Sequence, residues 1–208
     1  MSRLGEKESA GCKSSNKDPL AWEELRTEHI VQDQWIDFRK STYRYPDGRV
    51  FEPFYSYSRR DYVVIVASDT DGKYLCVRQF RHGIREVTTE FPAGGIERRD
   101  GKEYGTSQDL SAEDALAAAK RELLEETGYE SEEWKHLLTI PSNATVSDNY
   151  AYLFVAGNCR LVAGQDLDET EDLTVVKHSA REIEEMIRNG DFQQAMHVTA
   201  WLMAQRRQ

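Results

Sequence analysis

The chain of 208 residues is poor in cysteine, has no long apolar run and carries fewer basic than acidic residues. Its three cysteines show no Cys-X-X-Cys or Cys/His spacing, which argues against a zinc site and a disulfide framework and predicts reduced thiols in a cytoplasmic protein. No apolar run is near roughly 18 residues and no signal-peptide core is visible, so we expect neither a membrane span nor a secretory leader. The formal net charge of −10 argues against nucleic acid or an anionic membrane as the main partner.

The chain does have enough apolar content for one real core. With 39% hydrophobic residues over 208 positions, it fits one main domain with a small appendage. Residues 1–18 are small and polar, and we expect a disordered tail there. Residues 19–58 are rich in aromatic side chains and predict an N-terminal β unit, which leaves 59–208 as the main domain.

Turn signals and alternating apolar residues predict the strands. In the N-terminal unit, the strand-like stretches 35–45 and 49–58 flank the turn Pro46-Asp47-Gly48, a pattern that predicts a hairpin. In the main domain, the predicted strands cover 62–67, 74–78, 86–90, 134–140, 150–156, 160–163 and 173–177.

Two helices are predicted near the C-terminal end. Ser179 and Glu182 form a capping box for a helix that ends at Gly190, and Asp191 with Gln194 predicts the start of the next helix. Strands, one helix, more strands and then two helices indicate an α+β fold in which a mixed sheet lies between helical layers.

The stretch 112–129 predicts one continuous helix. Ser111 can cap its start, and Gly128 can end it in a left-handed turn. An apolar stripe at helical spacing predicts that one face packs on the core, and it comprises Ala115, Leu116, Ala119 and Leu123. Polar groups elsewhere on this helix would then be held on a rigid element.

Three carboxylates crowd one face of this helix over about one turn. Glu122, Glu125 and Glu126 stand at i, i+3 and i+4, where like charges repel by roughly a few tenths of a kcal/mol per pair. Hard oxygen ligands on a rigid helix suit Mg²⁺, which proteins hold with a few carboxylates and the phosphates of a substrate. The alternative is a solvated charged face, because glutamate is a common surface residue of helices. Only Arg121, four residues before Glu125, is placed to offset the cluster.

The spacing of these residues resembles the Nudix box, G-x5-E-x7-R-E-U-x-E-E-x-G-U, in which U is an apolar or aromatic residue. Glu113 and the run 121–129 match its second part without a gap. Ser107 stands where the opening glycine is expected, and Gly94, in the run F-P-A-G-G, is the glycine that looks equivalent. The polar run at about 98–110 is then interpreted as a loop insertion.

The resemblance extends over nearly all of residues 20–205 and indicates the branch of ADP-ribose and nucleoside-diphosphate-sugar pyrophosphatases. It rests on V-R-Q-F-R at 77–81, E-F-P-A-G-G at 90–95, the box, and an acidic run at 166–171. The fold it implies is an α/β/α sandwich with a mixed sheet, in agreement with the order of predicted elements. In this branch the N-terminal strands commonly exchange between two subunits, which implies a homodimer with 19–58 as the exchanged unit. A small hairpin cannot bury both of its faces alone, so packing on a partner is physically reasonable.

The resemblance also implies how a metal would be held. Mg²⁺, or Mn²⁺ in its place, would be bound by Glu122, Glu125, Glu126 and the backbone carbonyl of Ala93. Gly94 would let the backbone approach the ion closely. The site would therefore combine side-chain and main-chain oxygens, which are ligands that hard divalent ions prefer.

The general base is less constrained. By family position it is Glu171, with Glu169 next and a box glutamate as the competing candidate, while Arg121 belongs to the catalytic residues of the box. The alternative for the acidic run 166–171 is a solvated loop.

For substrate binding, the resemblance implies that Arg81 contacts a phosphate through its planar fork and that Glu90 holds water or ribose hydroxyls. The alternatives are a surface arginine and an exposed strand residue. Trp35 would stack on the base, with Phe51 or Phe54 on its other side, although packing in the core or at a dimer interface is the alternative for these aromatics. Weaker candidates are Trp22, Arg59 and Arg60. The histidines are interpreted as structural, and they are His29, His82, His136, His178 and His197.

These residues together predict a Mg²⁺-dependent enzyme that hydrolyses the pyrophosphate of a nucleoside diphosphate linked to a sugar. With ADP-ribose as the small-molecule substrate, the products are AMP and ribose 5-phosphate. The loop at 141–145 keeps only the proline and serine of the pattern expected there, which leaves the terminal sugar open. Two alternatives stand: hydrolysis of a GDP-mannose or ADP/UDP-hexose type of sugar, and a catalytically silent Nudix-like domain that binds a nucleotide and regulates a partner. The intact carboxylate triad argues against the silent domain, because it is costly to keep.

Overall fold

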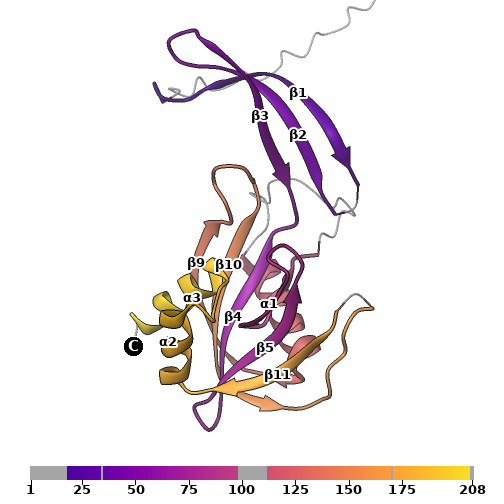
Figure 1. Ribbon diagram of the computed structural model, residues 1–208. Helices are drawn as coiled ribbons and strands as arrows, with labels where there is room; N and C mark the ends of the chain where they lie inside the picture. Colours follow the sequence, from indigo (N-terminus) through magenta and orange to yellow (C-terminus); the bar gives the residue numbers. More distant parts are fainter. Residues whose placement is uncertain (1–17, 34, 98–111, 170, 207–208) are drawn as a thin grey trace, which may run out of the picture.

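The computed structural model describes residues 18–33, 35–97, 112–169 and 171–206, with the side chains of 112–114 left out (Figure 1). Nearly all of the expected tail, the loop insertion at 98–110 and the expected cap Ser111 lie outside the described residues. In the described part of the chain, no helix is both long enough and apolar enough to cross a membrane.

The main domain is built on a mixed sheet. Its strands, in chain order, are β4 (Tyr62–Asp69), β5 (Tyr74–Arg81), β6 (Glu86–Glu90), β7 (Ala93–Gly95), β8 (Tyr129–Glu130), β9 (Glu133–Pro141), β10 (Tyr150–Leu161) and β11 (Leu173–His178). The spatial order is β11-β5-β4-β10-β8, with β6 beside β5, β7 beside β4 and β9 beside β10. Strand β10 runs parallel to β4, whereas the other pairs are antiparallel. Of the stretch expected as a separate strand at 160–163, residues 160–161 are the end of β10 and 162–163 follow it outside any strand, so that prediction is wrong in part.

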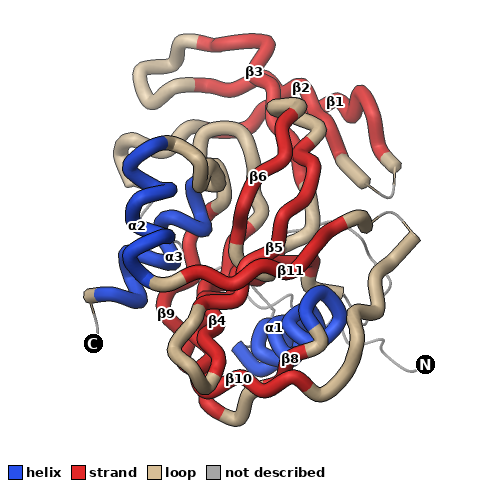
Figure 2. Tube along the Cα trace, turned by 60° about the horizontal axis from the view of Figure 1, so that its bottom comes forward, coloured by secondary structure: helices blue, strands red, loops and turns tan. Residues whose placement is uncertain are grey.

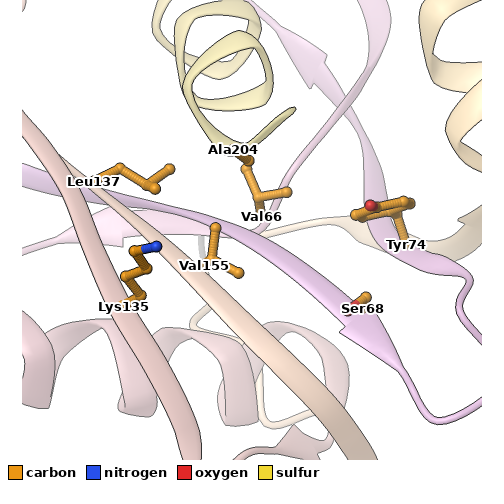
Figure 3. A pocket seen from close by; sticks show the side chains of 7 residues that line it. All are labelled: Val66, Ser68, Tyr74, Lys135, Leu137, Val155 and Ala204. Carbon is orange, nitrogen blue, oxygen red and sulfur yellow. The ribbon is translucent and has the colours of Figure 1, made fainter. Parts of the chain in front are cut away.

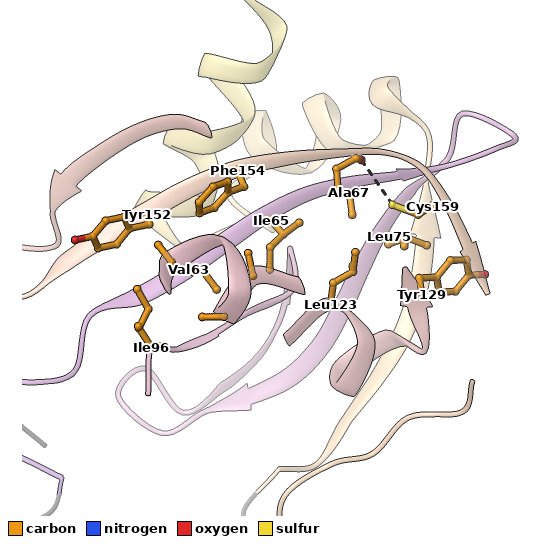
Figure 4. Packing of buried hydrophobic residues seen from close by; sticks show 14 residues of the cluster. Val63, Ile65, Ala67, Leu75, Ile96, Leu123, Tyr129, Tyr152, Phe154 and Cys159 are labelled. Carbon is orange, nitrogen blue, oxygen red and sulfur yellow. Dashed lines mark hydrogen bonds between the residues drawn. The ribbon is translucent and has the colours of Figure 1, made fainter. Parts of the chain in front are cut away.

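Helices cover both faces of this sheet (Figure 2). Along β4 the side chains alternate, because successive residues of a strand point to opposite faces. Val63 and Ile65 pack under α1 (Ala112–Thr127), as Figure 4 shows, whereas Val64 and Val66 pack under the two C-terminal helices. A strand that is apolar on both faces is typical of the centre of a sandwich. The predicted α/β/α architecture is confirmed.

Helix α1 begins and ends largely as its sequence indicates. Ala115, Ala119 and Leu123 of the expected apolar stripe are completely buried against the sheet. The helix ends at Gly128, which has φ +75° and donates its N–H to the Leu124 carbonyl at 2.7 Å. This left-handed residue is the predicted stop.

The C-terminal helices are α2 (Ala180–Asn189) and α3 (Ala195–Gln205). The Ser179–Glu182 capping box and the left-handed Gly190 are both present on α2. The predicted start of α3 at Asp191 is wrong, because the N–H groups of Asp191 and the following residue donate back to the Met186 carbonyl and complete the end of α2. Helix α3 begins after Gln194, whose side chain makes no capping bond.

The N-terminal unit is a three-stranded antiparallel sheet, β1 (Glu23–Gln32), β2 (Asp37–Arg44) and β3 (Val50–Ser58), and it projects from the main domain (Figure 1). The predicted hairpin corresponds to β2 and β3. Strand β1 was not predicted, so the prediction of two strands in this unit was wrong. Strand β1 escapes a sequence reading because nine of its ten residues are exposed and it has no apolar alternation.

Few contacts join this sheet to the main domain. The carboxylate of Asp148, in the loop after β9, accepts from Arg39 Nη2 at 3.0 Å and from Ser58 Oγ at 2.6 Å. The Tyr57 N–H donates to the Val146 carbonyl of the same loop at 2.8 Å. The loop between β9 and β10 therefore makes these hydrogen bonds between the main domain and the N-terminal sheet.

Candidate active site

Two of the three clustered carboxylates, Glu122, Glu125 and Glu126, are buried. Glu122 and Glu126 are 5% and 3% exposed, while the side chain of Glu125 is 36% exposed. Helix α1 carries these residues next to β7. The alternative of a solvated charged face is therefore wrong for Glu122 and Glu126. A buried carboxylate costs free energy unless a partner compensates it.

The guanidinium of Arg121 lies between two of the carboxylates. It donates to Glu122 Oε1 and to Glu125 Oε2, each at 2.6 Å. It also donates from Nη2 to the Gly95 carbonyl at 2.9 Å. The pair with Glu125 is the i, i+4 contact expected from the sequence, whereas the bond to Gly95 joins the helix to β7. Arg121 thus offsets repulsion within the cluster and fixes the strand beside it.

The backbone of β7 runs directly past the carboxylates. The Ala93 N–H donates to Glu126 Oε2 at 3.0 Å. A Cβ atom at position 94 would lie 2.0 Å from the Cδ atom of Glu122, so a residue with a side chain cannot replace Gly94 without displacing that carboxylate. Glycine is needed here for close approach rather than for an unusual φ. The strand therefore places backbone and carboxylate groups in one small volume.

Burial changes the titration of both buried carboxylates. It raises the pKa of Glu122 to about 7, and the nearby charges of Glu125 and Glu171 add to the shift. Burial also raises the pKa of Glu126 well above its usual value, with Glu122 and Glu171 again adding to it. A cation placed among these groups would stabilise their charged forms and reverse both shifts.

The donor set fits a hard divalent cation. Among the residues that the structure describes, no three acidic, histidine or cysteine side chains surround a common point as they stand, and Arg121 holds Glu122 and Glu125. Carboxylate and carbonyl oxygens are the ligands that Mg²⁺ and Mn²⁺ prefer, and the bare backbone of Gly94 leaves room for them to converge. Once the Arg121 side chain swings aside, the groups that could hold an ion are Glu122, Glu125, Glu126 and the Ala93 carbonyl.

Arg81, which is half-buried, and Glu90, which is buried, form an ion pair near this cluster. The guanidinium donates from Nε to Glu90 Oε1 at 2.7 Å and from Nη2 to Oε2 at 2.5 Å, and Thr88 Oγ1 donates to the same carboxylate. Glu90 is 0% exposed, so its interpretation as an exposed strand residue is wrong. Burial acts to raise the pKa of Glu90, but these hydrogen bonds hold it below its usual value. The charge of Arg81 also opposes the rise in the pKa of Glu126, which places the guanidinium within electrostatic reach of the box.

The loop before β11 brings Glu171 near the carboxylates. Glu171 is half-buried, and its charge raises the pKa of both Glu122 and Glu126. Its Oε2 accepts the Asp168 N–H at 3.2 Å, which orients the carboxylate. Glu169, by contrast, is exposed. The structure thus separates the two candidate bases by their surroundings.

Sequence reasoning missed two kinds of contact at this site. Gln165 Nε2 donates to the Glu126 carbonyl at 2.7 Å, and the Asp166 N–H donates to the Glu125 carbonyl at 2.9 Å. These carbonyls belong to the last turn of α1, where the helix itself offers them no N–H donor, and no local pattern reveals the loop contact. Thr88 did carry a signal, because it precedes Glu90 by two residues and so shares its face of β6.

The candidates for base recognition lie on the N-terminal sheet. Trp35 is 61% exposed in the connection between β1 and β2. Phe54 packs edge-on against Tyr43, with ring centroids 5.7 Å apart, and Arg59 is exposed just after β3. Within one chain, the structure therefore gathers the box, the Arg81–Glu90 pair and Glu171, the candidate general base. The candidates for recognition of the nucleotide base lie apart from them, in the N-terminal unit (Figure 1).

A small cavity lies on the opposite face of the main sheet from α1. Figure 3 shows this cavity, of about 120 Å³, lined by Val66, Ser68, Tyr74, Lys135, Leu137, Val155 and Ala204. Val66 and Leu137 belong to the core beneath α2 and α3, whereas α1 packs on the other face. The sheet therefore separates this cavity from the carboxylates.

Comparison with known proteins gives a family match over most of the main domain. A model of the NUDIX domain matches residues 58–198. The matched segment contains the carboxylate helix, Gly94, the Arg81–Glu90 pair and Glu171, and it begins where the N-terminal sheet ends.

Two curated relatives and one solved structure give the same picture. The chain is 27% identical over 158 residues to a methanol dehydrogenase activator of Bacillus methanolicus, covering 72% of this chain and 75% of that protein. It is 25% identical over 160 residues to an ADP-ribose pyrophosphatase of Bacillus subtilis (strain 168), covering 74% and 76%. The crystal structure of an ADP compounds hydrolase superimposes with a TM-score of 0.73 at 19% identity and covers 92% of this chain and 96% of that one, which shows a shared fold.

Proposed function

Because the chain belongs to the NUDIX domain family and is a Nudix hydrolase, we propose that it cleaves the pyrophosphate bond of a nucleoside diphosphate linked to a sugar, with ADP-ribose as the substrate and AMP and ribose 5-phosphate as the products. The similarity to an ADP-ribose pyrophosphatase supports this choice of substrate. The buried free thiols of Cys76 and Cys159 support a reducing compartment, which we take to be the cytoplasm.

The observation that carries this proposal is the pair of buried glutamates, Glu122 and Glu126, beside the bare backbone of Gly94. A domain that only bound a ligand or a partner would be as stable with apolar residues at these positions, since burying carboxylates is costly. A divalent cation that joins them to a diphosphate removes that cost, because it stabilises the charged carboxylates.

Enzymes of this family generally use divalent metal ions, and we propose Mg²⁺, with Mn²⁺ as the alternative. The chemistry that the bound ion supplies is neutralisation of the diphosphate charge and acidification of the attacking water. In the proposal, the ion is held by Glu122, Glu125, Glu126 and the Ala93 carbonyl. Without an ion, Arg121 bonds Glu122 and Glu125 and so holds these carboxylates beside β7, and binding of the ion would displace its guanidinium from them.

Other residues of the chain bind the substrate and move the proton. Glu171 takes the proton of the attacking water, since it is the half-buried acid whose charge acts on Glu122 and Glu126. Arg81 binds a phosphate with Nη1, while Glu90 accepts from its Nε and Nη2 and so fixes the plane of the guanidinium. A preorganised arginine loses little freedom on binding, which favours the transition state.

We further propose that the protein is a homodimer in which the unit 19–58 of each chain completes the site of the other chain, on the catalytic domain 59–208. Trp35 and Phe54, with Arg59, would then reach a substrate held by the partner. The exposed apolar side chains of the three-stranded sheet support this, because an isolated sheet with uncovered aromatics is rarely stable. They include Trp22, Ile30, Val31, Trp35, Val50, Phe51 and Tyr55.

A second candidate function follows from the similarity to a methanol dehydrogenase activator. In this reading, the chain binds a nucleotide and acts on a partner protein rather than on a substrate. Hydrolysis of a GDP-mannose or ADP/UDP-hexose type of sugar is the remaining alternative within the enzyme class. One substrate panel separates all three.

The test is release of phosphate from ADP-ribose, GDP-mannose, ADP-glucose and UDP-glucose with Mg²⁺ or Mn²⁺, coupled to a phosphatase that acts only on the monophosphate products. We expect turnover of ADP-ribose, and a loss of about a hundredfold or more in Glu125→Gln and in Glu126→Gln, because each removes a charge that holds the ion. Glu132→Gln, an exposed acid beyond the box, is the matched control and should keep full activity. No turnover of any sugar by the wild type favours the regulator, and near-normal rates in both box variants contradict the metal assignment.

A further inference from the structure

A buried histidine lies behind the candidate site. His197, on α3, is 3% exposed, and its Nδ1 accepts the backbone N–H of Phe91 at 3.1 Å. Its Nε2 lies 3.7 Å from Glu90 Oε2, the carboxylate that holds Arg81. The imidazole of α3 therefore lies against Glu90, the last residue of β6, and Phe91, which directly follows it.

The hydrogen bond defines the state of this ring. Because Nδ1 accepts from an N–H, it carries no proton, so the neutral imidazole bears its proton on Nε2, which faces the Glu90 carboxylate. Burial lowers the pKa of His197 to about 4, so the neutral form persists at neutral pH. Glu90 accordingly keeps Arg81 as its charged partner.

The segment that His197 holds leads directly to the carboxylates. Phe91 is followed by Pro92, whose ring fixes its own φ, and then by Ala93, whose N–H bonds Glu126. The Pro92 carbonyl accepts from the Ile65 N–H of β4 at 2.9 Å. His197 thus anchors one end of a short, stiff segment, and Glu126 bonds the other.

We propose that His197 is a positioning residue of the active site: by accepting the Phe91 N–H, it fixes the 91–95 segment so that the Ala93 carbonyl and the bare backbone of Gly94 meet the box glutamates. This inference rests on the proposed cation site at Glu122, Glu125 and Glu126. The imidazole touches no reacting atom, and its effect is transmitted through two residues of backbone. Such supporting contacts set how precisely a metal ligand is held.

The alternative is that His197 only satisfies a buried N–H within the core. Both roles lower stability when the ring is removed, so unfolding alone does not separate them. A positioning role also changes cation affinity in the folded protein, whereas a purely structural role leaves the affinity of the folded fraction unchanged.

Two variants of the full-length chain carry the test. His197→Leu keeps a side chain of similar size but removes the acceptor, whereas His197→Asn retains an amide oxygen close to the place of Nδ1. Ile183→Ala, at a buried position of α2 in the same core cluster as Phe91, is a control that lowers stability by removing buried atoms while leaving the His197–Phe91 hydrogen bond in place. Mn²⁺ binding is measured by electron paramagnetic resonance at a temperature where thermal melts show each variant to be folded.

We expect His197→Leu to weaken Mn²⁺ binding by about tenfold or more, as loss of a supporting contact does in other metal sites, and to raise the KM of any turned-over sugar more than it lowers kcat. His197→Asn should recover most of the affinity, and Ile183→Ala should bind Mn²⁺ like the wild type. Equal affinity in His197→Leu and wild type overturns the proposal, and so does a loss that His197→Asn fails to recover. Because Mn²⁺ binding is read without substrate, failure of the hydrolase proposal, seen as no turnover by the wild type, is distinguished from failure of this one.

Discussion

At the scale of single residues, Glu122 links the charge of the site to the stability of the fold. Its carboxylate is buried, and its pKa is raised to about 7. The folded protein therefore binds a proton at this group more tightly than the unfolded chain does. By linkage, its contribution to stability is fully present below the ordinary glutamate pKa and is lost as pH rises through about 7.

We predict that, in EDTA, the melting temperature of the protein falls as pH rises from about 5 to 8 by more than it falls in Glu122→Gln, which cannot ionise. Added Mg²⁺ should restore the melting temperature most strongly at the upper end of this range, because the ion binds the deprotonated carboxylates. Thermal melts followed by circular dichroism measure both effects. Identical pH profiles for wild type and Glu122→Gln would show that the burial of this carboxylate has no energetic consequence.

Glu171 and Glu169 belong to one loop but differ in burial and in their electrostatic effect on the box. Glu171 is half-buried and senses the box, whereas Glu169 is exposed. As the proposed base, Glu171→Gln should lower kcat by about a hundredfold or more while leaving Mn²⁺ affinity within about twofold, since general bases contribute on that order. The glutamine oxygen can still accept the Asp168 N–H, so the loop keeps its shape. A larger loss in Glu169→Gln than in Glu171→Gln would transfer the role to the exposed acid.

At the scale of secondary structure elements, the end of α1 shows how a single glycine joins two segments. Gly128 has φ +75°, and a Cβ atom there would lie 2.3 Å from the Ala163 carbonyl oxygen. Its own carbonyl accepts from the Val162 N–H at 2.9 Å. The glycine thus ends the helix and seats the loop that leads to Glu171.

We predict that Gly128→Ala destabilises the fold by about 2 kcal/mol or more, because strain at positive φ and a clash with the backbone act together. Gly190→Ala is the matched control, since Gly190 also has a positive φ of 84° at a helix end but has open space around it. It should cost only about 1 kcal/mol. Urea unfolding of the three proteins measures the difference, and equal losses would show that the contact with the 162–163 segment adds nothing.

Local signals account for what the sequence revealed of these elements. The carboxylate spacing, the stop at Gly128 and the capping box at Ser179 each lie within a few residues, and all three are present in the structure. The Arg81–Glu90 pair could not be inferred in the same way. In the β5–β6 register, Glu90 lies opposite Val77, and Arg81 reaches it along the strand. Pairings of this kind depend on side-chain direction, which a single sequence does not encode locally.

Burial also explains which elements and contacts could be predicted from the sequence and which could not. Strand β1 is exposed along almost its whole length, so it carries no apolar period and was missed. The supporting role inferred for His197 was equally hidden, because its partner is the backbone of Phe91, 106 positions away. A histidine on a buried helix face gives the same sequence pattern whether it fills the core or fixes a site.

At the scale of the whole molecule, the two sheets have different degrees of independence. The main sheet is covered on both faces by helices, whereas the N-terminal sheet is joined to it mainly through Asp148 and the 146–147 backbone. The exposed aromatics of the N-terminal unit include Trp35, between β1 and β2, whereas the box lies on α1 of the main domain. The proposed composite site, in which each catalytic domain uses the N-terminal unit of the other chain, would bring Trp35 and the box to one substrate.

Mixing two defective chains tests the composite site. Trp35→Ala damages the N-terminal unit and Glu126→Gln damages the box, so each homodimer is defective at both of its sites. In a heterodimer with exchanged units, one site combines the intact box of the first chain with the intact unit of the second, while the other site carries both lesions. Random pairing makes about half of the dimers mixed, and about a quarter of wild-type activity per site should return on co-expression.

Size-exclusion chromatography with light scattering should show a dimer for wild type and for both variants, which establishes that pairing itself is intact. If each chain instead builds its site from its own N-terminal unit, every site carries one of the two lesions. The mixed population then has no more activity than the average of the two variants. A fully active monomer after removal of 1–58 would contradict exchange outright. Recovery near a quarter requires that Trp35 and Glu126 of different chains serve one substrate, since no other pairing of these two lesions leaves an intact site.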